Sequence, residues 1–195
     1  MNNKKGRLFV ISGPSGAGKS TLINSAIEKL DGFIRSVSVT TRPKREDGSD
    51  KYKYNFVSEE EFKEMVENDK FLEYAKFCNY YYGTPKKYVE KMLDSGINVI
   101  LEIEVQGAMQ VKEKVGDVYM IFIVTSTMLS LEKRLKRRNT ESIDQIKKRL
   151  KIAEEELRYK KYYDCIIVNN DYNEALLNLK YILQKQGSRY KNENL

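Results

Sequence analysis

Histidine and tryptophan are absent from this 195-residue chain, which also has only two cysteines and three prolines. Without histidine, the sequence excludes Ser-His and Cys-His nucleophile pairs and histidine-bound zinc. Cys78 and Cys165 are too few for a disulfide scaffold, and they lack metal-ligand spacing. If the chain is an enzyme, its chemistry must therefore rest on lysine, arginine, carboxylates and a bound cation.

Long hydrophobic runs are also missing. No apolar stretch approaches the roughly 20 residues that a membrane-spanning helix needs. The run at positions 8–11 is too short for the core of a signal peptide, and no cleavage site follows it. We expect a cytoplasmic protein that does not associate with membranes.

The charge and size set further bounds. A net charge of +7 fits either nucleic acid or a small polyanion as partner. Most of the lysines are expected to be solvated surface, whereas arginine forks onto phosphate in a defined geometry. With 41% apolar and 32% charged residues, the chain is predicted to form one compact domain, with a polar frayed tail at 188–195.

Hydrophobic patterning predicts an α/β fold. Continuous apolar runs at 7–12, 98–103, 119–124 and 165–168 alternate with helical patterns, which is typical of a parallel sheet covered on both faces. The middle segment, from about Ser36 to Leu93, has shorter, more polar strands and is predicted to be a small α/β insert. Strands are expected at 34–41, 71–77 and 80–82, and helices at 19–30, 58–68, 84–96, 129–138, 142–160 and 174–186, the last ended by Gly187.

A glycine-rich loop follows the first predicted strand. The segment Gly13-Pro14-Ser15-Gly16-Ala17-Gly18-Lys19-Ser20 matches G-x-x-x-x-G-K-[ST] at every required position, between a buried strand and a helix. Its backbone N–H groups and the helix N-terminus favour phosphate. Lys19 is expected to reach the β- and γ-phosphates of a nucleoside triphosphate, and the Ser20 hydroxyl to ligate Mg²⁺. The alternative, a glycine-rich turn that matches by chance, is disfavoured by this context.

The loop alone leaves three classes of protein open: a phosphotransferase with a small acceptor, a nucleotide-dependent switch or motor, and an inactive interaction module. Further motifs narrow the choice, because in order and spacing they make positions 7–186 resemble guanylate kinase. The motifs are Ser36-Val37-Ser38-Val39-Thr40-Thr41-Arg42-Pro43-Lys44-Arg45, Tyr54-Asn55-Phe56-Val57, Phe71-Leu72-Glu73-Tyr74-Ala75, Tyr81-Tyr82-Gly83-Thr84-Pro85, Val105-Gln106-Gly107 and Val168-Asn169-Asn170-Asp171.

The resemblance implies transfer of the γ-phosphoryl group of ATP to GMP, giving ADP and GDP, with Mg²⁺ as cofactor. It implies a P-loop core (1–34, 94–125 and 150–195), a GMP-binding insert (35–93) and a helical lid (126–149). The partners implied are the small molecules ATP and GMP, with dGMP as a further acceptor. Neither nucleic acid nor a membrane is expected, and the chain would be a monomer or a weak homo-oligomer.

The resemblance also assigns acceptor residues. Glu73 matches the guanine-recognising glutamate, whose carboxylate can accept from both the ring N1–H and the exocyclic amine; adenine would present an acceptor there instead. The alternative for Glu73 is the polar face of a strand, and for Arg42 and Arg45 it is solvated surface charge. The implied GMP-binding set is Ser38, Arg42, Arg45, Tyr54, Glu73, Tyr82, Thr84 and Glu104.

On the donor side, the resemblance extends ATP binding beyond the loop, to Thr21, Arg134, Arg138 and Asn169. Arg134 and Arg138 lie in the basic segment 131–140, which resembles the lid, and Arg149 lies on the helix after it. Several arginines suit phosphoryl transfer, since the moving group needs positive charge rather than covalent help. The alternative is an amphipathic basic helix. The implied catalytic set is Lys19, Arg42, Arg134, Arg138 and Arg149.

The chain departs from the family pattern in one chemically important place. Glu102-Ile103-Glu104 stands where the family usually has Asp-x-Asp, so the charge is kept and the reach is one methylene longer. Glu102 is expected in the Mg²⁺ shell through water, and Glu104 on the guanine side. The loops Glu46-Asp47-Gly48, Thr125-Ser126-Thr127 and Arg138-Asn139-Thr140 also depart from the usual sequences.

Two alternatives belong to other functional classes. The first is an inactive guanylate-kinase-like interaction module, which the intact phosphate loop argues against. The second is a nucleic-acid-binding ATPase, suggested by Tyr80-Tyr81-Tyr82 and the positive charge. These tyrosines lie in one short predicted strand and do not interleave with a basic stripe, so we favour the kinase.

Overall fold

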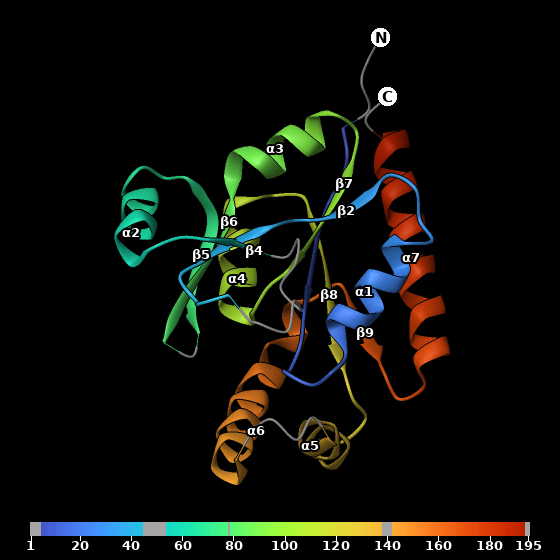
Figure 1. The fold of residues 1–195 in the computed structure, drawn as a ribbon. Coiled ribbons are helices and arrows are strands. Elements are labelled where there is room, and N and C mark those ends of the chain that lie inside the picture. The colour runs from blue at the N-terminus through green and yellow to red at the C-terminus, as the bar shows by residue number, and fades with distance from the viewer. Residues whose placement is uncertain (1–4, 45–53, 78, 138–141, 194–195) are drawn as a thin grey trace.

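The computed structural model describes residues 5–44, 54–77, 79–137 and 142–193. Its core is a parallel sheet in the strand order β2-β7-β1-β8-β9 (Figure 1). Every residue of β1 is buried, as its continuous apolar sequence predicts. The five strands are β1 (Leu8–Ser12), β2 (Phe33–Arg35), β7 (Asn98–Glu102), β8 (Val118–Val124) and β9 (Cys165–Val168).

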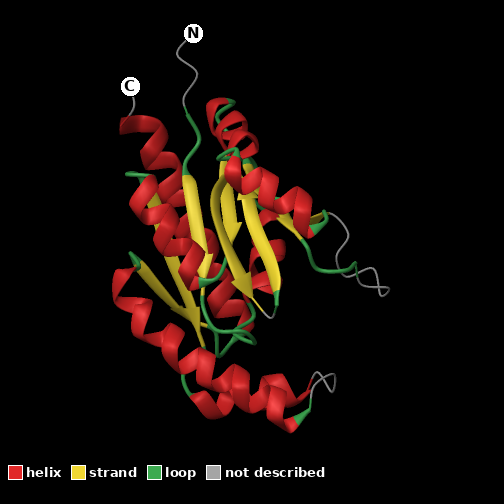
Figure 2. Cartoon of the chain, turned by 90° about the vertical axis from the view of Figure 1, so that its left-hand side faces the viewer, coloured by secondary structure: helices red, strands yellow, loops and turns green. Residues whose placement is uncertain are grey.

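Helices cover both faces of this sheet (Figure 2). On one face, Phe9 and Ile11 of β1 pack into a cluster with α1 (Lys19–Ile27) and α7 (Tyr172–Glu193). The alternate residues of β1 pack on the other face, against α3 (Lys86–Asp94) and α4 (Val105–Lys114). Successive strand residues point to opposite faces, so one apolar run supplies both halves of the core.

A second sheet with the order β4-β3-β6-β5 lies beside the core. It is mixed, since β3 pairs parallel with β4 while β6 pairs antiparallel with both β3 and β5. Phe62 of the adjacent helix stacks on Phe71 at 4.6 Å and on Tyr81 at 5.4 Å between ring centroids. The elements are β3 (Ser38–Thr40), β4 (Tyr54–Phe56), α2 (Glu59–Glu67), β5 (Phe71–Phe77) and β6 (Tyr80–Pro85).

Two further helices, α5 (Met128–Arg137) and α6 (Ile143–Leu157), lie beyond one end of the core strands (Figure 1). Leu131 and Leu135 of α5 are buried; a methyl group at Gly16 of the phosphate loop would lie 3.2 and 3.1 Å from them. A short 3₁₀ helix, Arg158–Tyr162, leads from α6 to β9. The apolar stripe of α5 therefore packs on the phosphate loop.

The predicted fold class is confirmed: a parallel sheet covered by helices, with a smaller α/β unit inserted in the chain. Both predicted capping boxes are present, at Ser58 with Glu61 and at Ser142 with Gln145. Within the described ranges, no helix has the length and apolar character that crossing a bilayer requires.

Several predicted elements need correction. The strand expected at 34–41 is two strands: β2 belongs to the core sheet and β3 to the second sheet. The C-terminal helix does not end at Gly187 but runs to Glu193, so the described part of the expected frayed tail is helical. A Cβ at Gly187 would lie 2.9 Å from Asn98 Nδ2, so this glycine permits close packing rather than capping the helix.

Two helix ends also differ from the prediction. The helix that begins at the second capping box ends at Leu157, and the chain then tightens into the 3₁₀ helix. Pro85 takes the N-cap position of α3, with no side-chain cap hydrogen bond. The Thr84 hydroxyl does not cap this helix but donates to Glu73.

Candidate active site between the two sheets

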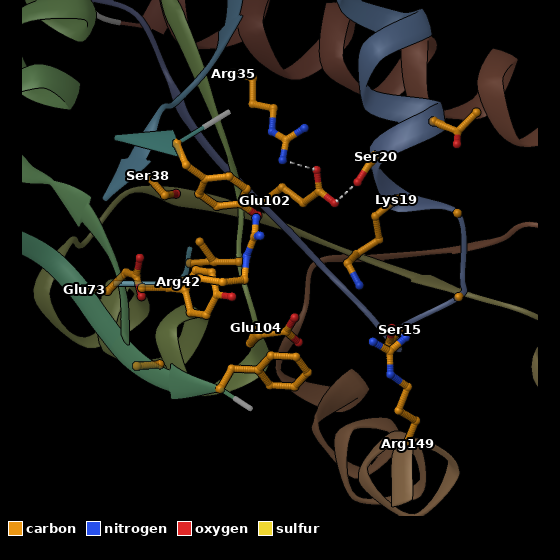
Figure 3. A pocket seen from close by; sticks show the side chains of 18 residues that line it. Ser15, Lys19, Ser20, Arg35, Ser38, Arg42, Glu73, Glu102, Glu104 and Arg149 are labelled. Atoms are coloured by element: carbon orange, nitrogen blue, oxygen red, sulfur yellow. Dashed lines mark hydrogen bonds and ion pairs between the residues drawn. The ribbon is translucent and has the colours of Figure 1, made fainter. Parts of the chain in front are cut away.

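A cavity of about 280 Å³ lies where the phosphate loop faces the second sheet (Figure 3). One end is formed by the loop and the start of α1, and the other by strands of the second sheet and the end of β7. The side chains come from segments far apart in the sequence. The lining residues are Ser15, Gly16, Gly18, Lys19, Ser20, Thr21, Arg35, Ser38, Arg42, Tyr54, Glu73, Ala75, Phe77, Tyr82, Glu102, Ile103, Glu104 and Arg149.

The glycines of the phosphate loop are required by its backbone. Gly13, Gly16 and Gly18 have φ values of 144°, 93° and 92°, which residues other than glycine rarely adopt. A Cβ at Gly13 would lie 2.0 Å from the carbonyl oxygen of Ile123, and one at Gly18 would lie 2.4 Å from Asn169 Nδ2. The loop therefore curls tightly against β8 and the end of β9.

Lys19 begins α1 and lines the cavity. Its ammonium group donates to the carbonyl oxygens of Gly13 and of Pro14, the latter at 3.3 Å. The side chain is thus folded back over the loop whose N–H groups and helix N-terminus attract anions.

Ser20, Glu102 and Arg35 form a chain of contacts beside the loop (Figure 3). Ser20 Oγ donates to Glu102 Oε1 at 2.6 Å, and the other carboxylate oxygen lies 2.8 Å from Arg35 Nη2. The Glu102 and Arg35 side chains are only 10% and 16% exposed. Since a hydroxyl and a carboxylate are oxygen ligands of the kind Mg²⁺ takes, this part of the site fits that cation.

Arg134 and Asn169 brace the phosphate loop from behind. Arg134 donates to the carbonyl oxygens of Ala17 at 3.3 Å and Asn169 at 2.6 Å. The amide of Asn169 donates to the same Ala17 oxygen at 2.7 Å. On the cavity side, Arg149 of α6 donates to Ser15 Oγ at 3.2 Å. Both helices beyond the sheet thus contact the loop through arginine.

Glu73 lies at the opposite end of the cavity and is only 3% exposed. Thr84 Oγ1 donates to its Oε1 at 2.5 Å. Burial raises the pKa of Glu73 to about 7, although the bonds from Thr84 and the positive charge of Lys114 act in the opposite direction. Near neutral pH this carboxyl group is therefore poised between its charged and neutral forms.

Arg42, Tyr54 and Tyr82 form the part of the cavity wall next to Glu73. The guanidinium of Arg42 lies over the ring of Tyr54, 5.5 Å from its centroid, and also donates to the carbonyl oxygen of Pro43. The ring of Tyr54 meets that of Tyr82 edge-on at 5.9 Å. A guanidinium held over an aromatic ring in a cleft suits an anionic ligand.

Two neighbouring carboxyl groups connect α6 to the start of α4: Glu156 of α6 and Glu104, the N-cap residue of α4. Burial raises the pKa of Glu156, and the neighbouring Glu104 raises it further, while Lys19 lowers it. The hydrogen bond and the charge repulsion from Glu104 both disfavour ionisation of Glu156. Glu156 follows Arg149 by seven residues on α6, so both lie on one face of that helix.

Comparison with known proteins identifies the family. The family model described as guanylate kinase matches residues 5–186. The chain belongs to the guanylate kinase family. It is 48% identical over 180 residues to a guanylate kinase of Caldanaerobacter subterraneus subsp. tengcongensis, covering 92% of this chain and 87% of the relative. It is 45% identical over 191 residues to one of Desulfitobacterium hafniense, covering 98% and 96%.

A solved guanylate kinase structure agrees. The crystal structure of guanylate kinase from Anaplasma phagocytophilum is 31% identical in sequence, with a TM-score of 0.78 over 96% of this chain and 89% of that one. The match spans the core, the second sheet and the helices beyond the strands.

Most residues predicted for the site meet in one cavity. The predicted residues Gly13, Pro14, Ala17, Arg134, Asn169 and Thr84 are not among those that line it. The first three belong to the phosphate loop, and the other three contact that loop or a lining residue. Arg45 and Arg138 fall outside the described residues. The predicted residues lining the cavity are Ser15, Gly16, Gly18, Lys19, Ser20, Thr21, Ser38, Arg42, Tyr54, Glu73, Tyr82, Glu102, Glu104 and Arg149.

Arg35 and Glu156 are charged residues near the site that were not predicted. Arg35 had a signal in the sequence, since it is a charged residue in the same phase of alternation as Val37 and Val39. Glu156 had none, because it lies in a helix rich in charged residues, where a solvated carboxylate is the ordinary expectation.

Proposed function

We propose that this chain transfers the γ-phosphoryl group of ATP to GMP, releasing ADP and GDP. The observation that carries the proposal is one shared cavity, which has the phosphate loop at one end and the buried residue Glu73 with Arg42 at the other. A triphosphate and a guanine monophosphate can then meet between these ends. Membership of the guanylate kinase family supports the same reaction.

In the proposed donor half, the backbone of residues 13–21 and the ammonium of Lys19 hold the ATP phosphates. Ser20 and, through water, Glu102 would hold Mg²⁺, for which their oxygen atoms fit. When bound, this cation supplies positive charge to the β- and γ-phosphate oxygens. Asn169 and Arg134 support the loop through the carbonyl oxygen of Ala17.

In the proposed acceptor half, ionised Glu73 accepts hydrogen bonds from the guanine N1–H and exocyclic amine. Thr84 orients the carboxylate by donating to one oxygen. Adenine would place an acceptor against this group and leave both unpaired, which costs a buried site several kcal/mol. Glu104 and Ser38 complete the base side, and Arg42, Arg45, Tyr54 and Tyr82 hold the phosphate of GMP.

The proposed transfer is a direct displacement. A phosphate oxygen of GMP bonds to the γ-phosphorus of ATP as the bond to the β–γ bridging oxygen breaks, and that oxygen leaves on ADP. Lys19 and Arg42 stabilise the charge on the moving group, and the arginines at 134, 138 and 149 do so once they close over the triphosphate; no covalent intermediate forms. Closing of segment 126–149 as a lid would exclude water, which competes with GMP as acceptor.

The same proposal covers organisation and setting. Residues 1–34, 94–125 and 150–195 form the core, 35–93 the GMP-binding part and 126–149 the lid. The enzyme acts in the cytoplasm on small molecules, as a monomer or weak homo-oligomer, without nucleic acid or membrane partners, and accepts dGMP as well as GMP.

An ADP-release assay with ATP and Mg²⁺, and GMP, AMP, UMP or dTMP as acceptor, tests the proposal. We expect turnover with GMP to exceed that with each of the others by at least about a hundredfold, since a site built to hydrogen-bond a base rejects one that mismatches it. Glu73→Gln should lower kcat/KM for GMP by roughly tenfold or more. Equal turnover with AMP and GMP would overturn the assignment of the acceptor.

A further inference from the structure

One face of helix α4 is turned toward strand β5, which carries Glu73. Gly107, Gln110 and Lys114 are spaced by three and four residues, so they lie along one side of the helix. Each is close to a different one of three consecutive residues on the strand: Glu73, Tyr74 and Leu72, respectively. The helix thus lies against three consecutive residues of the strand, with Glu73 in the middle.

The contacts of Gln110 resemble those of a neighbouring strand. β5 is the last strand in the order of its sheet, so its outer edge has backbone groups that β6 does not pair. The Gln110 side chain accepts from the Tyr74 N–H at 3.2 Å and donates to the Tyr74 carbonyl oxygen at 2.7 Å. Lys114 Nζ donates to the carbonyl oxygen of Leu72, two residues away on the same edge, at 3.2 Å.

Gly107 provides the space for the carboxylate itself. A Cβ at this position would lie 2.2 Å from Glu73 Oε2 and 3.0 Å from its Cδ. Any side chain at 107 would therefore displace the carboxylate or the strand. With Thr84 bonded to the other oxygen, Glu73 is held between β6 on one side and the backbone of α4 on the other.

We propose that this face of α4, made of Gly107, Gln110 and Lys114, positions Glu73 and thereby sets the selectivity of the site for guanine. The inference rests on the proposed role of Glu73 in binding the base. α4 follows directly from its N-cap residue Glu104, two positions after β7 ends at Glu102, and Glu102 contacts Ser20 on the donor side. This face of α4 therefore fixes the position of the base-binding carboxylate relative to the phosphate loop. A strand at the edge of a separate sheet cannot do this alone.

Lys114 has a second effect, which is electrostatic. It is the charged side chain that lowers the pKa of Glu73, with the Thr84 hydrogen bonds acting in the same direction against burial. Removing its charge raises this pKa further, so a smaller share of the enzyme carries the ionised carboxylate near neutral pH. Gly107 and Gln110 act on the position of the carboxylate, and Lys114 on both its position and its charge.

The test compares Gln110→Ala and Lys114→Met with the matched control Lys112→Met. Lys112 lies on the same helix but donates to the carbonyl oxygen of Tyr162 rather than to β5. We expect Gln110→Ala to raise KM for GMP by roughly threefold to tenfold, the range that losing one or two hydrogen bonds predicts. KM for ATP and the melting temperature should stay near those of wild type, and Lys112→Met should leave KM for GMP unchanged.

A selectivity measurement separates positioning from loss of folded enzyme. Inosine monophosphate has the N1–H of guanine but not its exocyclic amine, so a displaced carboxylate should lower the ratio of kcat/KM for GMP over IMP. Partial unfolding lowers both values equally and leaves the ratio unchanged. Gly107→Ala should lower the ratio most; if it does not fold, Gln110→Ala still decides the question.

The charge effect has its own measurement. In Lys114→Met, the rise of kcat/KM for GMP with pH should have its midpoint at higher pH than in wild type, whereas Gln110→Ala should keep the wild-type midpoint. The inference is overturned if Glu73→Gln impairs GMP use while Gln110→Ala and Lys114→Met leave both KM and the GMP/IMP ratio unchanged. If Glu73→Gln itself has no effect, the proposed acceptor role fails instead.

Discussion

Ser20 Oγ donates a 2.6 Å hydrogen bond to Glu102 Oε1, although the two residues are separated by 82 positions in the sequence. The other oxygen of the same carboxylate lies 2.8 Å from Arg35 Nη2. Both oxygens of Glu102 are thus engaged, one by the first turn of α1 and one by the end of β2. This arrangement orients the carboxylate beside the hydroxyl that is proposed to bind Mg²⁺.

Glu102→Asp should impair the enzyme even though aspartate is the residue the family usually has here. A side chain one methylene shorter cannot hold both Ser20 and Arg35 in the observed arrangement. Because hydrogen bonds to charged groups are each worth about 1.5–3 kcal/mol, we expect kcat/KM for ATP to fall roughly tenfold or more. Steady-state kinetics with varied Mg²⁺ measure the loss, with Glu113→Asp on the exposed side of α4 as control. An Asp variant as active as wild type would show that the reach of Glu102 is unimportant.

The use of GMP should depend on pH through Glu73. Only the ionised carboxylate can accept from both guanine donors, and its pKa is about 7. We therefore expect kcat/KM for GMP to rise between about pH 6 and pH 8 as this group loses its proton. The GMP phosphate also titrates near this range, so Glu73→Gln is the control. A pH profile identical in wild type and Glu73→Gln would assign the transition to another group.

The folding stability of the chain without substrates should depend on pH in the opposite direction to its use of GMP. The pKa of Glu73 is higher in the folded chain than the ordinary value of 4.5, so the folded state binds more protons between about pH 4.5 and pH 7. The contribution of this group to folding stability therefore falls as the pH rises through that window. Above about pH 7, the destabilisation by the buried charged carboxylate is complete.

Glu73→Gln removes this cost. Without substrates, the variant should melt at a higher temperature than wild type near pH 8, and the difference should shrink toward about pH 5. Thermal unfolding followed by circular dichroism at several pH values measures it. Equal melting temperatures near pH 8 would mean that the buried carboxylate carries no penalty, and a wild type more stable than the variant would reverse the sign.

Gly18→Ala should destabilise the phosphate loop. Gly18 has φ of 92°, and a Cβ there would lie 2.4 Å from the Asn169 amide that braces the loop. Backbone strain of this kind costs about 1–3 kcal/mol, before the loss of the Asn169 contact is added. We expect a lower melting temperature and weaker ATP binding by calorimetry. Gly116→Ala is the matched control, since a Cβ at Gly116 has no heavy atom within 4 Å; a similar loss in both variants would contradict the prediction.

The parts of the fold that were predictable are those with local signals. The phosphate loop has a required spacing between a strand and a helix, and β7, β8 and β9 are short apolar runs between charged segments. The break between β2 and β3 was not predictable. Ser36 still donates its N–H to Ile100 of the core sheet, while Val39 packs with Phe62 of α2, and an alternating pattern does not say that a strand changes sheets.

The parts of the site that were missed depend on pairing between distant elements. Arg35 reaches Glu102 because β2 lies parallel to β7, with Arg35 opposite Ile100, two residues before that carboxylate. Gln110 and Lys114 have the appearance of a solvated helix face until β5 is placed beside them. In each case the residue type was visible in the sequence, but its partner was set by tertiary packing.

The end of β7 has an evolutionary consequence. Glu102 faces Ser20, and two residues later Glu104 lines the same cavity and is the N-cap residue of α4, the helix that contacts β5. Only Ile103 separates the two carboxylates. Insertion or deletion of a single residue here would turn one carboxylate away and rotate the Gly107 face off the strand at the same time. A change of length at this point would therefore require simultaneous compensation in both halves of the site.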